Sequence, residues 1–332
     1  MTMTKIFIDG SAGTTGLQIH ERLRLREDIQ LLTIDDDKRK DNDARRELFN
    51  EADIVFLCLP DAAAIDAVSL IDNNHTVVID TSTAHRVSEG WAYGMPELTG
   101  ARELIKASKR IANPGCHASG FIALVAPLVE NGIISPDTKL TCFSLTGYSG
   151  GGKKMIVEYE RENRNILLNA PRQYGLSQTH KHIPEMMKVC GLTHAPVFCP
   201  IVADYYSGME VSVPLHRSDI NGGLESIREI YKHYYIAGVI RYVENEDENG
   251  FLSAGKFSGL DNMDISVSGN DERILLTARF DNLGKGASGA AVQNMNLVMG
   301  VNEFEGLNLD LDFWTRCPDF DSLLGKERSH EL

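Results

Sequence analysis

The sequence lacks any apolar run long enough to span a membrane, and its N-terminus lacks the basic start, apolar core and small-residue cleavage site of an export signal. It also lacks an excess of positive charge, because 33 Lys and Arg residues stand against 47 Asp and Glu residues, a formal net charge of -14. General nucleic-acid and anionic-membrane binders carry the opposite sign. These absences predict a cytoplasmic protein that binds a small molecule, and an anionic substrate would need locally clustered cations.

The six cysteines include no CxxC pair, and most of them lie in apolar runs. Buried, reduced thiols are therefore expected rather than disulfides. His180 and His182 stand two residues apart without a third ligand nearby, which is a poor pattern for zinc. The sequence therefore predicts no metal site.

Strand-like and helix-like segments alternate through the first third of the chain. The strand-like segments 5–9, 30–34, 52–59 and 75–80 are apolar on both faces, and helix-like segments separate them. Strands of this kind are typical of a parallel sheet covered by helices on both sides. The first part of the chain is therefore predicted to be a Rossmann-like dinucleotide-binding domain of the α/β class.

A second domain is expected, because 332 residues exceed the size at which a single core usually stops growing. Alternating runs at 140–149, 195–202 and 208–215 resemble long antiparallel strands. We predict an α+β substrate and dimerisation domain over residues 116–284, with a large mixed or antiparallel sheet. Residues 1–115 and 285–332 are assigned to the dinucleotide-binding domain, because the helix-like segment 286–304 is expected to return to it.

A glycine-rich turn follows the first strand-like segment and precedes a helix. Its GxxGxxG spacing permits a tight turn in which the helix N-terminus offers free N–H groups to a diphosphate, although a purely structural turn is the alternative. The predicted dinucleotide contacts in this turn are Gly10, Ser11, Gly13, Thr14, Thr15 and Gly16.

The choice between NAD and NADP depends on residues after the second strand-like segment. An acidic residue there favours a free 2′-hydroxyl, and a cation favours the 2′-phosphate. Asp35–Asp37 and Lys38–Lys40 supply both kinds, with Arg39 as the candidate phosphate ligand. The local sequence leaves the choice open.

Cys116 follows Asn113, Pro114 and Gly115 and precedes an apolar helix-like segment. The partial positive charge of a helix start lowers the pKa of a thiol and increases its thiolate fraction. We therefore predict that Cys116 is a covalent nucleophile. Packing as a small apolar residue is the alternative, and it suits the other cysteines in apolar runs better.

Proton transfer and anion binding need further residues. His180 and His182, just before a helix-like segment, are both candidates for the acid/base, and the sequence does not rank them. Ser82 is predicted to line the cofactor crevice, because it follows the last strand-like segment of the first domain. The predicted substrate-binding residues are Arg86 in the same loop and Ser149 and Lys153 in a glycine-rich segment that could form an anion nest.

These motifs together resemble the N-acetyl-gamma-glutamyl-phosphate reductase family in its short form. In order along the chain they are "GSAGTTG", "DTSTAHR", "YGMPEL", "NPGCHASGFIALVAP", "SGGGKK", "HKHIPE" and "GASGAAVQNMN". The commoner family signature has an aromatic residue and a threonine where His117 and Ser119 stand here. These departures retain the cysteine and the glycines and are consistent with the short subgroup.

The resemblance implies a fold like that of glyceraldehyde-3-phosphate dehydrogenase and a homodimer or homotetramer. It implies NADPH-dependent reduction of N-acetyl-L-glutamyl 5-phosphate to N-acetyl-L-glutamate 5-semialdehyde in arginine biosynthesis, through a thioester on Cys116, and it adds Asn294 to the cofactor contacts. The acidic residues Asp35–Asp37 favour a free 2′-hydroxyl, so NAD remains the alternative cofactor. The alternatives are an aspartate-semialdehyde dehydrogenase type of reductase and a non-catalytic dinucleotide sensor.

Overall fold

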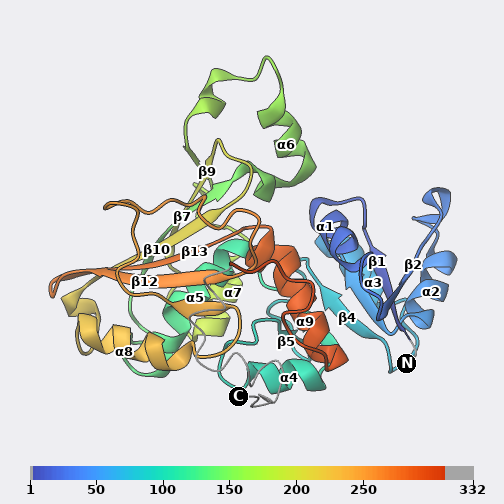
Figure 1. Ribbon diagram of the computed structural model, residues 1–332, viewed down its shortest axis with the longest axis horizontal. Coiled ribbons are helices and arrows are strands. Elements are labelled where there is room, and N and C mark those ends of the chain that lie inside the picture. The colour runs from blue at the N-terminus through green and yellow to red at the C-terminus, as the bar shows by residue number, and fades with distance from the viewer. Residues whose placement is uncertain (1–2, 311–332) are drawn as a thin grey trace, which may run out of the picture.

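The computed structural model describes residues 3–310, which form two sheets lying side by side (Figure 1). Residues 311–332, which the sequence prediction assigned to the first domain, lie outside the described residues. The first sheet has six parallel strands in the order β2-β1-β3-β4-β6-β5. In chain order its strands are β1 (Thr4–Asp9), β2 (Ile29–Leu32), β3 (Ile54–Leu57), β4 (Val77–Asp80), β5 (Ala92–Tyr93) and β6 (Arg110–Ala112).

Helices cover both faces of the six-stranded sheet, as the continuous apolar strands predict. On one face, Ile6 and Phe56 pack in a buried cluster with residues of α1 (Thr14–Leu23) and of α9 (Gly289–Met299). On the other face, Phe7 and Val55 pack with residues of α2 (Asn42–Glu51) and α3 (Asp61–Val68). The strands alternate their side chains between faces, so β1, β3 and β4 each contribute to both clusters. The helices of this part of the chain are α1 (Thr14–Leu23), α2 (Asn42–Glu51), α3 (Asp61–Val68) and α4 (Ala101–Ala107).

The second sheet is mixed and has seven strands in the order β11-β12-β13-β10-β7-β9-β8. In chain order they are β7 (Thr141–Gly147), β8 (Arg172–Gln173), β9 (Val197–Ala203), β10 (Met209–His216), β11 (Ile240–Tyr242), β12 (Met263–Gly269) and β13 (Arg273–Phe280). The prediction that 140–149 and 195–202 are antiparallel strands is wrong in one respect, because β7 and β9 pair in parallel. Sequence alternation reports which face of a strand is buried, but it carries no information on strand direction.

One face of the seven-stranded sheet is covered by α5 (Cys116–Glu130), α7 (Ile183–Cys190) and α8 (Leu224–Tyr234) (Figure 1). Helix α5 is apolar almost all round because it lies between the sheet and α7 and α8. A methyl group at Gly120 would lie 2.5 Å from Cγ2 of Val211, so glycine is what allows the helix this close to β10. In Figure 1, α6 (Gly152–Glu160) stands out from the rest of the molecule.

The chain returns to the six-stranded sheet through a π-helical turn (Gly284–Ser288) and α9 (Gly289–Met299). Ala291, Val292 and Met295 of α9 belong to the buried cluster that contains Ile6. Lys285 holds the π-helical turn in place, because its ammonium lies 2.9 Å from both carboxylate oxygens of Glu97. Within residues 3–310 there is no helix long and apolar enough to cross a membrane.

Candidate active site

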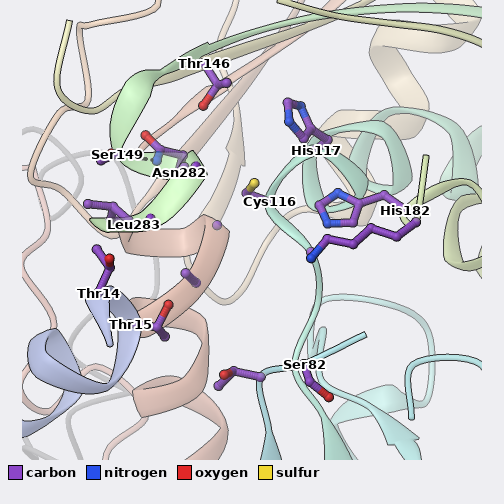
Figure 2. A pocket seen from close by; sticks show the side chains of 18 of the residues that line it. Thr14, Thr15, Ser82, Cys116, His117, Thr146, Ser149, His182, Asn282 and Leu283 are labelled. Carbon is purple, nitrogen blue, oxygen red and sulfur yellow. Dashed lines mark hydrogen bonds between the residues drawn. The ribbon is translucent and has the colours of Figure 1, made fainter. Parts of the chain in front are cut away.

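A cavity of about 560 Å³ lies where the carboxyl ends of the first-sheet strands face the second sheet. Loops at the carboxyl ends of parallel strands form the usual ligand crevice of such sheets. Figure 2 shows Thr14 and Thr15 of α1 on one side of this space and His117 and His182 on the other, with Cys116 between them. The predicted site residues that line the cavity are Gly13, Thr14, Thr15, Gly16, Ser82, Arg86, Cys116, Ser149, His180 and His182.

The glycine-rich turn has the geometry of a diphosphate cradle. Gly10 has φ +86°, and a Cβ there would overlap the carbonyl oxygen of Cys58 on the neighbouring strand end. A Cβ at Gly16 would lie 2.5 Å from the carbonyl oxygen of Gly10, while the N–H of Gly13 donates to that oxygen at 2.9 Å. Helix α1 begins at Thr14 and its first residues line the cavity, so the free N–H groups of the helix start lie beside that space.

Four of the predicted cofactor contacts do not line the cavity, and one of them is Gly10, which shapes the turn from behind. Ser11 is half-buried in the turn, and Arg39 is exposed and forms an ion pair with Asp36 at 2.6 Å. Asn294 is fully buried; its Nδ2 donates to the carbonyl oxygen of Gly94 at 2.9 Å and to Oδ1 of Asn113 at 3.2 Å. Asn294 therefore supports Asn113, which does line the cavity.

Cys116 is the first residue of α5, with Gly115 as the N-cap. Burial raises the pKa of Cys116 to about 11, although the charge of Arg86 and the backbone N–H of His117 both favour the thiolate. The prediction of a lowered pKa is therefore wrong for this structure, because the loss of water around the thiol outweighs the helix start. A methyl group at Gly286 of the π-helical turn would lie 2.9 Å from Cβ of Cys116, so the two domains meet at this residue.

Glu185 is the residue that links the loops around Cys116. It is 1% exposed, and its Oε1 accepts from Nη1 of Arg86 at 2.8 Å. Its Oε2 accepts from the hydroxyl of Tyr93 at 2.8 Å and from the N–H of Gly115 at 3.1 Å. Glu185 follows the histidine pair in the motif "HKHIPE", and no local pattern in the sequence indicates that it pairs with a residue 99 positions away.

The two predicted histidines both line the cavity but differ in their surroundings. Nδ1 of His180 accepts from the backbone N–H of His182 at 3.2 Å. His182 is 5% exposed, and its Nδ1 has no hydrogen-bond partner among the described residues. Burial lowers the pKa of His180 to about 4 and holds the pKa of His182 well below its ordinary value. Both rings are therefore neutral at neutral pH.

Arg86 uses all three nitrogens of its guanidinium inside the protein. Nε donates to the carbonyl oxygen of Asn113, Nη2 to that of Thr81, and Nη1 to Glu185. The structure thus gives Arg86 a role in holding the loops around Cys116. Lys181, which sequence reasoning did not single out, lines the cavity and is exposed.

The glycine-rich segment after β7 reaches the cavity through Ser149, whose hydroxyl accepts from Nδ2 of Asn282 at 3.0 Å (Figure 2). Gly150, Gly151 and Gly152 also line the cavity, whereas Lys153 is exposed on α6 and does not. His117 and Tyr174 are two further lining residues that the sequence did not identify as functional. His117 adjoins Cys116, and Tyr174 lies in a segment without helical or strand periodicity.

The fold and the cysteine at the junction of the two sheets define a class of two-domain, dinucleotide-dependent enzymes. Comparison with family models agrees: the model described as "Semialdehyde dehydrogenase, NAD binding domain" matches residues 5–108, and "Semialdehyde dehydrogenase, dimerisation domain" matches residues 116–282. The fold is also that of aspartate semialdehyde dehydrogenase from Francisella tularensis, with a TM-score of 0.67 at 13% identity over 90% of this chain and 100% of that chain.

Relatives of much higher identity narrow the class. An N-acetyl-gamma-glutamyl-phosphate reductase of Nostoc sp. is 42% identical over 92% of this chain and 100% of its own length. One from Chelativorans sp. is 46% identical over 89% of this chain and 98% of its own length, and one from Brucella suis is 44% identical over 89% and 99%. The chain belongs to the N-acetyl-gamma-glutamyl-phosphate reductases of the semialdehyde dehydrogenase family, as the motifs predicted.

Proposed function

We propose that the protein reduces N-acetyl-L-glutamyl 5-phosphate to N-acetyl-L-glutamate 5-semialdehyde and phosphate, with NADPH, in arginine biosynthesis. The observation that carries this proposal is the single cavity that joins the glycine-rich turn of α1 to Cys116 at the start of α5. An enzyme that reduces an acyl phosphate through a thioester needs the cofactor-binding turn and the nucleophile to line the same cavity, because the bound cofactor and the nucleophile act on one carbon atom.

Cys116 is the proposed nucleophile and His182 the proposed acid/base. His180 accepts the N–H of His182 at Nδ1, so its neutral ring carries the proton on Nε2 and has no free basic nitrogen. Nε2 of His182 faces Gly115, because a Cβ on Gly115 would lie 2.5 Å from it. His182 is therefore placed beside the loop that carries Cys116, and binding of an anionic substrate nearby favours its protonated form.

The proposed sequence of bonds follows from these roles. The thiol proton of Cys116 passes to His182, the Sγ–C bond forms, and the C–O bond to phosphate breaks with its electron pair leaving on phosphate. When bound, the nicotinamide supplies the hydride that reduces the acyl carbon. The S–C bond of Cys116 then breaks, its electron pair returns to sulfur, and the aldehyde carbonyl re-forms. The proton held by His182 returns to the Cys116 thiolate, which restores both groups.

The dinucleotide is proposed to bind on the turn Gly10–Gly16 and beside Ser82. Glycines that exclude a Cβ and a helix start with free N–H groups fit a diphosphate. Arg39 is the proposed ligand for a 2′-phosphate, because it is exposed after β2 and its one ion pair within residues 3–310 is a surface pair with Asp36. Asn294 is proposed to act indirectly, through Asn113.

The anionic ends of the substrate are proposed to meet Lys181, Ser149 and the backbone of Gly150–Gly152. Lys181 lines the cavity with an exposed side chain, and glycine amides in a turn suit an anion. Arg86 also lines the cavity and contributes positive charge, although three of its five N–H donors are bonded to Asn113, Thr81 and Glu185. Lys153 remains a candidate only if α6 moves, since it lies outside the cavity lining.

We also propose the domain division predicted from the sequence, with residues 285–332 joining 1–115, and a homodimer or homotetramer. The packing of α9 with β1 supports the division. Phe143 and Val197, 41% and 55% exposed, lie on the face of the seven-stranded sheet opposite α5 and suit a contact between subunits. The unpaired thiols of Cys58, Cys142 and Cys190 suit the cytoplasm.

The test is phosphate-dependent oxidation of N-acetylglutamate semialdehyde with NADP and with NAD, alongside aspartate semialdehyde. We expect turnover of the first aldehyde, faster with NADP, and its loss in Cys116→Ser while the variant still binds the dinucleotide. Turnover of aspartate semialdehyde alone would favour the aspartate-semialdehyde dehydrogenase alternative, which the relatives do not favour. Dinucleotide binding without turnover of either aldehyde would favour the sensor.

A further inference from the structure

His117, the residue after Cys116, is buried and has a partner on each ring nitrogen. Its Nδ1 lies 2.7 Å from Oγ of Ser144, and its Nε2 lies 2.7 Å from the hydroxyl of Tyr174. Burial lowers the pKa of His117 to about 3, so the ring is neutral at neutral pH and carries one proton. The position of that proton depends on the two hydroxyl partners.

Ser144 decides which ring nitrogen of His117 is protonated. Ser144 is fully buried on β7, and within residues 3–310 its hydroxyl has His117 as its one hydrogen-bond partner. If Nδ1 carried the proton, Ser144 would accept it and its own hydroxyl hydrogen would remain unpaired in the interior, which is unfavourable. Ser144 therefore donates to Nδ1, and the ring proton is on Nε2.

This tautomer fixes the direction of the hydroxyl of Tyr174. Nε2–H of His117 donates to the phenolic oxygen, so the phenolic hydrogen cannot point at His117. Tyr174 lines the cavity that contains Cys116, and a negative charge on Cys116 would raise the pKa of Tyr174 further than burial already does. The phenol is thus protonated, lines the same cavity as Cys116, and can donate its hydrogen into that space.

We propose that Tyr174 is a catalytic residue that donates a hydrogen bond to the acyl oxygen of the substrate, and that His117 and Ser144 are positioning residues that aim it. The inference rests on the proposed function. When the Sγ–C bond forms, the carbonyl electron pair moves onto this oxygen, and it returns when the C–O bond to phosphate breaks. Tyr174 stabilises that charge without transferring its proton.

Tyr174 suits the acyl oxygen better than the phosphate group. The phosphate group carries full negative charge. Its better partners are the exposed cation Lys181 and the glycine-rich segment after β7, which line the same cavity. A neutral donor that is held in one direction on the cavity of the nucleophile stabilises most strongly a charge that develops only in the transition state. His117 is one of the two positions at which this chain departs from the commoner family signature.

The first experiment compares Tyr174→Phe with the control Tyr148→Phe, whose ring lies outside the cavity lining. We expect kcat to fall roughly 10²–10³-fold in Tyr174→Phe, in both reaction directions, with KM nearly unchanged and cofactor binding intact. The control should keep wild-type kcat. A wild-type kcat in Tyr174→Phe, or a rise in KM alone, would overturn the proposal. An inactive wild type would contradict the proposed function and leave the second experiment as the test.

The second experiment reads the tautomer directly and needs no turnover. In protein labelled with ¹⁵N-histidine, the signals of His117, assigned by their loss in His117→Gln, should show protonation at Nε2. A proton on Nδ1 would overturn the proposal. His117→Gln, whose amide can still donate to the phenol, should keep more activity than His117→Phe. Equal loss in these two variants would also contradict the positioning role.

Discussion

The guanidinium of Arg86 and the carboxylate of Glu185 form an ion pair at 2.8 Å whose side chains are 7% and 1% exposed. The pair joins the loop after β4 to the start of α7, and through Gly115 it also fixes the residue before Cys116. A buried pair of this kind is costly to break, because the remaining partner is left charged without water. The pair therefore couples the stability of the fold to the position of the nucleophile.

Glu185→Gln should lower the free energy of unfolding by about 3 kcal/mol, because it removes the charge that pairs with buried Arg86. The measurement is urea unfolding followed by circular dichroism. Glu103→Gln, which removes an exposed partner of Lys106, is the control and should change it by less than about 0.5 kcal/mol. Equal effects in the two variants would contradict this account.

The thiol of Cys116 should be poorly reactive in the free enzyme. Its pKa of about 11 lies roughly two pH units above the ordinary value of 9.0, so at pH 8 the thiolate fraction is about 100-fold lower than for an unperturbed cysteine. The rate of alkylation by iodoacetamide should rise about tenfold per pH unit from pH 7 to pH 10. Cys116→Ala corrects for the other cysteines. A plateau near pH 7 would show instead that the thiol is already ionised.

Much of the fold was predictable because local sequence patterns determine many of its strands, helices and turns. Strand β3, buried along its whole length, reads as a continuous apolar run, and the turn at Gly10 reads as glycine between a strand and a helix. The parallel pairing of β7 and β9 was not predictable, since it depends on the path of the chain through α6 and α7.

Residues of the site could be predicted only where the reactive side chain and its characteristic neighbours stand in one short segment of the sequence. Cys116 and the histidine pair each stand in a short motif, so each was predicted as functional, and the structure places them on one cavity. The partners of Glu185 come from three separate segments, and no local pattern indicates them. The pKa of Cys116 was mispredicted because burial is a property of the whole fold.

Single replacements of the two histidines should separate their roles. His182→Gln should lower kcat by about 10²–10⁴-fold, because it removes the proposed proton acceptor for Cys116. His180→Gln should lower it much less, since the basic nitrogen of His180 is occupied by the N–H of His182. Dinucleotide binding, measured by fluorescence titration, should hold in both. The reverse order of the two effects would assign the acid/base role to His180.

Gly10→Ala should weaken dinucleotide binding at least tenfold, because the added methyl overlaps the carbonyl of Cys58 and distorts the turn. Gly100→Ala is a matched control: Gly100 also has a positive φ, +72°, but a methyl there meets nothing within 4 Å. The two variants share the conformational strain, so a difference in cofactor affinity reports the turn alone. Equal affinities would remove the turn from the cofactor site.

Arg39→Gln should raise the KM for NADPH about tenfold and leave the KM for NADH unchanged, because only NADPH carries the 2′-phosphate that the guanidinium would bind. Arg39 must exchange its surface pair with Asp36 for the phosphate, so the gain is expected to be near 1.4 kcal/mol, which is tenfold in affinity.

Salt provides a second readout of the Arg39 contact, because an exposed ion pair is screened. The KM of the wild type for NADPH should rise more steeply with ionic strength than that of Arg39→Gln. Arg24→Gln, which removes another exposed and paired arginine of the same domain, should change neither KM. If Arg39→Gln raises both KM values equally, the residue acts on the fold or on the shared part of the cofactor, and NADP selection must come from Lys38 or Lys40.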